Sequence, residues 1–194
     1  MGRPREFDTE TALESAMQVF WSKGYEATAL TNLIGAMGIS KSSFYDTFGS
    51  KHELYIATLD RYQERFAQRG LRARIKAAGG GKRGIVAVFE RLVAEVSAGG
   101  ERRGCFINNT AVELAGHDAQ CCARVEDGFA CMTAAFQDAL VEARGRGEIG
   151  PDHEVEALAG YLTASLNGLL VLAKGAADRA HLEAVAGIVT GALD

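Results

Sequence analysis

The scarcity of proline limits the folds that this chain can adopt. Of its 194 residues only Pro4 and Pro151 are proline, so residues 5–150 contain none. Proline removes a backbone hydrogen-bond donor and clashes with the preceding turn of an α-helix, so long proline-free stretches favour long helices. Apolar residues recur in these stretches at helical spacing, and the alternation typical of β-strands is almost absent. The sequence predicts an all-α protein.

Glycines and N-capping residues divide the chain into about nine predicted helices. Gly38 can take the left-handed conformation that a tight turn between two helices requires, and Ser40 can cap a third helix over residues 41–48. The next helix begins after Ser50 and is expected to run to about residue 77. The later helices are expected at about residues 84–98, 105–115, 118–144, 153–174 and 178–193.

Composition narrows the class of protein. Hydrophobic residues make up 47% of the chain and charged residues 24%, which is typical of a globular protein with a core. A formal net charge of −4 argues against a protein that coats nucleic acid indiscriminately. The polar N-terminus shows no signal peptide, the apolar run 157–173 is short for a membrane span, and the four cysteines lack the pattern of a secreted disulfide framework. We expect a cytoplasmic protein with no membrane partner.

The predicted third helix, KSSFYDTF, has an unusually polar outer face. Phe44 and Phe48 are four residues apart and would pack against the first two helices. Three short helices with a tight turn between the second and third form a helix-turn-helix. A recognition helix exposes short polar side chains so that its backbone can enter the major groove of DNA. The candidates for this role are Lys41, Ser42, Ser43 and Thr47.

Further side chains around this helix are suited to contacts with the DNA backbone. Tyr45 presents a ring with a hydroxyl that can reach a phosphate, and Lys51 adds a charge at the start of the next helix. Thr28, before the second helix, is a third candidate for a phosphate contact. Arg3 and Arg5 form a basic arm that could lie in a narrow minor groove, where the potential is most negative.

The first 60 residues or so resemble the DNA-binding domain of the TetR/AcrR family of transcriptional regulators. The resemblance implies a helix-turn-helix domain over residues 1–50 and a larger helical domain for effector binding and dimerisation over residues 51–194. It further implies a homodimer and, usually, repression that an inducer relieves. Ile34 departs from the pattern, since many relatives have a small residue there. The matching parts are Gly24-Tyr25, Thr28, Gly38-Ile39-Ser40, Phe44-Tyr45, Phe48, Ser50-Lys51 and Leu54.

A homodimer would place two recognition helices one DNA turn apart, which predicts a roughly palindromic operator. The last two predicted helices are the expected interface, because their small residues permit close approach and their large apolar residues bury area. The alternative is that these residues build only the core of the monomer. The interface candidates are Leu158, Leu162, Leu166, Leu169, Leu172, Leu182, Val185, Ile188 and Val189.

Cys105 is a candidate sensor of oxidants or electrophiles. Arg102 and Arg103 precede it and a predicted helix begins beside it, and both features would lower the pKa of its thiol. Its Gly-Cys sequence also resembles relatives that sense electrophiles. The alternative is an inert buried cysteine. No metal site is expected, because the spacing of His117 and Cys121 is not a known zinc pattern. Residues that could line an apolar effector pocket, or could form core, are Phe89, Phe106, Phe129, Met132 and Phe136.

The leading hypothesis is a sequence-specific DNA-binding transcriptional regulator without catalysis or cofactor. It would be a repressor released by an unidentified small-molecule inducer or by modification of Cys105. An enzyme with Cys105 as nucleophile would need an oriented base, and none of the four histidines lies in a recognisable catalytic motif. A helical adaptor that binds only protein would expose apolar anchors where this chain has a polar recognition helix.

Overall fold

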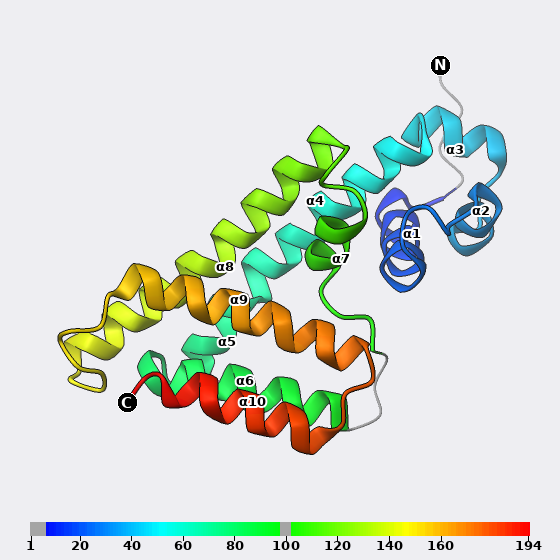
Figure 1. Ribbon diagram of the computed structural model, residues 1–194. Helices are drawn as coiled ribbons and strands as arrows, with labels where there is room; N and C mark the ends of the chain where they lie inside the picture. The colour runs from blue at the N-terminus through cyan, green and yellow to red at the C-terminus, as the bar shows by residue number, and fades with distance from the viewer. Residues whose placement is uncertain (1–6, 98–101) are drawn as a thin grey trace.

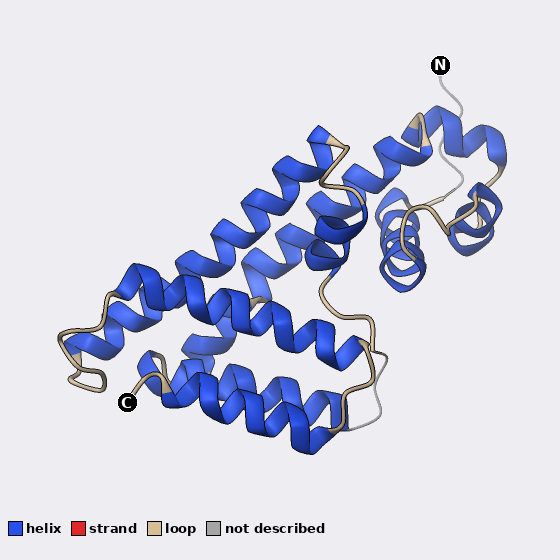
Figure 2. Ribbon diagram, in the orientation of Figure 1, coloured by secondary structure: helices blue, strands red, loops and turns tan. Residues whose placement is uncertain are grey.

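The computed structural model describes residues 7–97 and 102–194, and all regular structure in these ranges is helical (Figure 2). This confirms the predicted all-α class. The basic arm with Arg3 and Arg5 lies outside the described residues. The ten described helices are α1 (Thr9–Lys23), α2 (Leu30–Met37), α3 (Lys41–Phe48), α4 (Lys51–Arg69), α5 (Leu71–Ala77), α6 (Gly81–Ser97), α7 (Phe106–Glu113), α8 (Ala119–Gly145), α9 (Val155–Lys174) and α10 (Arg179–Gly191).

The helix expected to run from residue 50 to about 77 is broken. Gly70 has φ −87° and ψ −147°, which is outside the helical region, and it separates α4 from α5. Leu71 and Ile75 of α5 then turn into the core. Local sequence did not decide this break, because an isolated glycine inside a helical pattern is often tolerated. Burial of the two apolar side chains of α5 favours the redirected course.

The predicted turn at Gly38 and the predicted third helix over residues 41–48 are confirmed. The hydroxyl of Ser40 accepts the N–H of Ser43 at 3.1 Å and so caps α3. Gly38 ends α2 with φ +65°, in the left-handed conformation that the turn requires. An added Cβ at Gly38 would meet nothing within 4 Å, so backbone conformation rather than crowding favours glycine there.

Two buried clusters hold the molecule together. In Figure 1, α1–α3 lie at one end of α4, and α4 runs from them into the body formed by α5–α10. The first cluster contains Phe20 and Phe44 of the helix-turn-helix together with Phe106 of α7 and Cys121 of α8. The second is formed by α5, α6, α8, α9 and α10. Because α7 and α8 contribute to the first cluster, the helix-turn-helix shares a core with the C-terminal part of the chain.

The last two helices bury one face in the second cluster and expose the other. By length and composition α9 could cross a membrane, but one side of it packs on α8 and α10. Leu158 and Val185 are half-buried against the core, while Leu172 and Ile188 are exposed, Ile188 at 74%. The interface prediction was wrong for the side chains that the monomer itself buries, because their faces pack inward: Leu162, Leu166, Leu169, Leu182 and Val189.

Candidate nucleic-acid interface and effector cavity

The outer face of α3 presents the predicted contact residues together. Lys41 and Ser42 are exposed, Ser43 and Thr47 are half-buried, and Tyr45 retains 47% of its exposure. Phe44 is fully buried on the opposite side, so α3 has the polar outer face and the apolar inner face that its sequence predicted. The hydroxyls of Ser42 and Ser43 lie 3.3 and 2.9 Å from that of Ser40. A hydroxyl both donates and accepts hydrogen bonds, so this group suits a DNA surface that offers both.

Lys51 is the first residue of α4, the helix that follows α3 in the chain. Its ammonium group lies 4.2 Å from the centroid of the Tyr25 ring, within the range of a cation–π contact. The contact holds a positive charge beside the helix-turn-helix. The sequence predicted Lys51 as a phosphate contact but gave no sign of the role of Tyr25, which lies in the turn between α1 and α2.

The structure does not favour Thr28 as a phosphate contact. Its side chain is fully buried, and its hydroxyl donates to the carbonyl oxygen of Gly24 at 2.6 Å. Thr28 therefore stabilises the turn between α1 and α2 from inside. Its presence in the motif is explained by this local bond rather than by contact with DNA.

A carboxylate from α7 holds the same turn from outside. The two oxygens of Glu113 accept the backbone N–H groups of Tyr25 and Glu26 at 3.0 and 2.9 Å. An ionised acceptor makes such hydrogen bonds about twice as strong as neutral ones. Sequence analysis missed Glu113, because nothing local pairs it with residues almost ninety positions earlier. The contact joins the C-terminal part of the chain directly to the helix-turn-helix.

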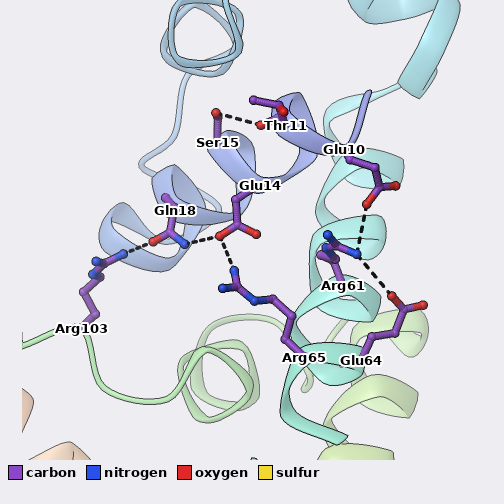
Figure 3. Close-up of polar contacts among 9 residues, drawn as sticks. All are labelled: Glu10, Thr11, Glu14, Ser15, Gln18, Arg61, Glu64, Arg65 and Arg103. Atoms are coloured by element: carbon purple, nitrogen blue, oxygen red, sulfur yellow. Dashed lines mark hydrogen bonds and ion pairs between the residues drawn. The ribbon is translucent and has the colours of Figure 1, made fainter. Parts of the chain in front are cut away.

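Arg103 and Gly104, which precede α7, also contact α1. The indole N–H of Trp21 donates to the carbonyl oxygen of Gly104 at 3.0 Å, and the guanidinium of Arg103 lies 5.0 Å from the Trp21 ring. Arg103 also donates to Gln18, as Figure 3 shows. Residues 103–113 thus contact the helix-turn-helix at both ends.

A row of polar contacts continues between α1 and α4. Figure 3 shows Glu14 between Gln18 and Arg65, whose guanidinium lies 2.5 Å from the Glu14 carboxylate. Farther along, Arg61 pairs with Glu10 at 3.0 Å. Pairs this exposed contribute little stability individually, so their main effect is to set how α1 lies on α4.

A cavity of about 500 Å³ lies between α4, α5, α7 and α8, and its size suits a small organic ligand. Of the predicted effector residues, Cys105 and Met132 line it. Phe89, Phe106 and Phe136 are instead fully buried core residues, and Phe129 packs against both clusters. The wall includes residues that sequence reasoning missed, namely Asp60, Tyr62, Gln63, Glu64, Leu71, Arg72, Ile107, Asp127, Gly128, Cys131 and Ala135.

The prediction of a lowered pKa for Cys105 was wrong. Cys105 is buried, and burial raises the pKa of its thiol. The hydroxyl of Tyr62 donates to its sulfur at 3.6 Å. The guanidinium of Arg102 lies 3.5 Å from the carbonyl oxygen of Ala177, and that of Arg103 points to α1, so the neighbouring charges are directed elsewhere.

A helix-turn-helix that shares its core with a helical body containing a cavity defines a DNA-binding transcriptional regulator of the one-component type. Residues 12–58 match the family described as bacterial regulatory proteins, tetR family, and residues 81–189 match the tetracyclin repressor-like C-terminal domain. The chain belongs to the TetR family. The families and relatives that it matches are regulators rather than enzymes.

Individual relatives cover almost the whole chain. It is 34% identical over 184 residues to the uncharacterized HTH-type transcriptional regulator YezE of Bacillus subtilis, covering 94% of each chain. It is 30% identical to the HTH-type transcriptional repressor ComR of Escherichia coli, over 96% of this chain and 89% of that one. A cysteine mutant of the TetR family regulator CifR, solved in complex with 26-bp operator DNA, matches with a TM-score of 0.82 and 31% identity over the full length of both chains.

Proposed function

We propose that this protein is a cytoplasmic, homodimeric repressor that leaves a palindromic operator when a small molecule enters the cavity or when Cys105 is modified. Residues 1–50 would bind DNA, and residues 51–194 would sense the effector and dimerise. The observation that carries the proposal is that one short segment, residues 105–113, both lines the cavity and holds the helix-turn-helix. The repressor ComR and the operator-bound CifR support it as relatives of similar length.

The proposed DNA contacts follow from exposure on and around α3. Tyr45 and Lys51 would contact phosphates and so fix the register of the helix, while Ser42 and Ser43 would reach base edges. Lys41 and Thr47 would contribute from the same helix. The basic arm with Arg3 and Arg5 remains a proposed minor-groove contact.

Helix α7 is the proposed connection between cavity and DNA. Ile107, in its first turn, lines the cavity, and Glu113, its last residue, holds the N–H groups of Tyr25 and Glu26. A ligand that displaces α7 would weaken these two bonds and so favour a second orientation of the helix-turn-helix. Repression would then fall according to the ligand's different affinities for the two forms.

The outer faces of α9 and α10 are the proposed dimer interface. Added Cβ atoms at Gly160, Gly168 and Gly187 would meet nothing within 4 Å, so the monomer gives no steric reason for glycine there. A closely packed partner helix would give one. The exposed residues available to the partner are small or apolar and include Gly160, Tyr161, Ala164, Gly168, Val171 and Leu172 of α9 and Ala184, Gly187 and Ile188 of α10.

Ile188→Arg should therefore convert the dimer to monomers at micromolar concentration. A two-fold interface contains the position twice, so each dimer would bury two unpaired charges, and loss of a central contact costs about 2 kcal/mol or more. The measurement is sedimentation velocity across a concentration series. Val112→Arg is the matched control, because Val112 is 84% exposed but lies on α7. Equal dissociation constants for Ile188→Arg and wild type would refute this interface.

Selection of bound duplexes from a random DNA library tests the proposed function as a whole. Reduced protein should enrich one roughly palindromic motif, and protein treated with an electrophile should enrich it poorly. If both samples enrich the same motif equally, the protein is still a sequence-specific regulator, but modification of Cys105 does not release it from DNA. Enrichment of no motif by either sample at moderate salt would contradict sequence-specific DNA binding.

Cys105→Ser should remove the response to electrophiles while preserving DNA binding. In the wild type we expect treatment to weaken operator affinity by roughly 5- to 150-fold, the usual range of allosteric coupling. Because the pKa of the thiol is raised, its reaction should accelerate as the pH rises above neutral. Titration of labelled operator measures both effects. Cys131→Ser is the control, since Cys131 lines the same cavity but is exposed. A normal response in Cys105→Ser would exclude sensing through this thiol.

A further inference from the structure

Three side chains that commonly bind metals meet where α4 approaches α8. His52 is the second residue of α4, Asp118 is the N-cap of α8, and Cys121 lies in the first turn of α8. One ligand atom from each lies within 4.8 Å of the other two. The sequence separates His52 from Asp118 by 66 positions, so only the fold brings the imidazole, the carboxylate and the thiol together.

Asp118 organises this group. One carboxylate oxygen accepts the backbone N–H groups of Gln120 and Cys121 at 3.0 and 2.9 Å, while the other lies 2.6 Å from Nε2 of His52. These contacts join the N-terminus of α8 to the first turn of α4. The side chains of His52 and Asp118 are 33% and 20% exposed, and Cys121 is fully buried.

We propose that His52, Asp118 and Cys121 form a binding site for a divalent transition metal ion of the zinc type. Imidazole, carboxylate and thiolate are the three ligand classes that zinc takes in proteins, and this mixed set disfavours magnesium and calcium, which prefer oxygen alone. The thiolate and the carboxylate would neutralise the two positive charges of the ion. Water can complete a tetrahedral set from the side on which His52 is exposed.

Binding exchanges a proton for the metal ion. The thiol of Cys121 loses its proton to solvent as its sulfur bonds to the ion. In the metal-free protein Nε2 of His52 donates its proton to the Asp118 carboxylate at 2.6 Å, so the neutral ring must first carry its proton on Nδ1, which leaves the lone pair of Nε2 free to bind the ion. Metal affinity should therefore increase as the pH rises.

The site lies between α4, which follows the helix-turn-helix, and α8, which lines the effector cavity. His52 follows Lys51, a proposed phosphate contact, while the same helix that carries Cys121 lines the effector cavity farther along with Gly128 and Met132. A metal ion would replace one hydrogen bond between α4 and α8 with coordinate bonds to both helices. It would thereby favour one orientation of the helix-turn-helix and change operator affinity. This regulatory part rests on the proposed function, whereas metal binding itself does not.

Titration of the reduced protein with Co²⁺ tests the site without DNA. Wild type should bind one ion per chain and develop the near-ultraviolet charge-transfer absorbance of a cobalt–thiolate bond. Cys121→Ser should lack that absorbance, and Cys105→Ser, which alters another buried cysteine, should retain it. Absence of the band in wild type, or its persistence in Cys121→Ser, would overturn the proposal.

His52→Gln provides a second variant that should fold, because the side chain is partly exposed and does not belong to the core. Zn²⁺ should raise the melting temperature of wild type by mass action and leave that of His52→Gln unchanged. Zn²⁺ should also change operator affinity at least fivefold in wild type only, a typical coupling. An equal thermal shift in both proteins would exclude His52 as a ligand. If wild type shows the cobalt absorbance but Zn²⁺ leaves its operator affinity unchanged, the protein binds metal and the regulatory part of the proposal is wrong. If the DNA selection enriches no motif at all, the proposed function fails instead, and metal binding is unaffected.

Discussion

Phe106→Ala should lower the free energy of unfolding by about 3–5 kcal/mol, the usual effect of removing a buried phenylalanine side chain. Phe106 is 1% exposed and begins α7. Its ring lies 6.5 Å from Trp21 of α1 and 5.5 and 5.6 Å from Tyr55 and Tyr62 of α4. The substitution would leave a cavity where three helices meet. Urea denaturation followed by circular dichroism measures the loss.

The same substitution should weaken operator binding by the folded protein. The backbone N–H of Phe106 lies 3.4 Å from the Tyr62 hydroxyl, and α7 ends at Glu113, which holds the turn after α1. Loosening the first turn of α7 should therefore disturb the orientation of the helix-turn-helix. Phe89→Ala is the matched control, because Phe89 is equally buried but belongs to the second cluster. If both variants, measured well below their melting temperatures, bound operator equally, the proposed connection through α7 would be wrong.

The features that sequence predicted correctly are those determined within a few residues. The αL turn at Gly38, the cap at Ser40 and the inward side of Phe44 each depend on neighbours along one helix or turn. Gly70 marks the limit of such reasoning, because glycine permits a break without requiring one. What decides the break is the burial of Leu71 and Ile75, and that depends on helices far along the chain.

The contacts that connect the parts of the molecule could not be predicted in this way. Glu113 looks like any acidic residue near a helix end, and only the fold places its carboxylate on the turn after α1. The pKa of Cys105 was misjudged because adjacency to Arg103 in sequence does not say where the guanidinium points. The leucines of α9 posed a similar problem, since the same apolar spacing suits a monomer core and a dimer interface. Whether a given leucine belongs to the monomer core or to the dimer interface depends on which helices pack against it, and the spacing of apolar residues along one helix does not show this.

Tyr45→Ala should weaken operator binding by roughly 10²- to 10⁴-fold without affecting the dimer. A hydrogen bond to a charged group contributes about 1.5–3 kcal/mol, and a dimer would lose two of them, at about 1.4 kcal/mol for each factor of ten. Tyr45 is 47% exposed and touches Phe44 only edge-on, at 5.2 Å between ring centroids, so folding should change little. Operator titration and sedimentation velocity measure the two properties.

The salt dependence separates a hydroxyl contact from a charge contact at the same surface. Neutral Tyr45 releases no counterion when it binds a phosphate, so Tyr45→Ala should reduce affinity by the same factor at every salt concentration. Lys41→Ala should instead flatten the dependence of log affinity on log salt by about 0.9 for each lysine contact removed, or about 1.8 per dimer. Tyr45→Phe retains the ring and loses only the hydroxyl, so it should reproduce most of the alanine defect if the phosphate contact is the cause. Wild-type affinity in Tyr45→Phe together with a large loss in Tyr45→Ala would assign the effect to packing of the ring, and wild-type affinity in both would place Tyr45 outside the interface.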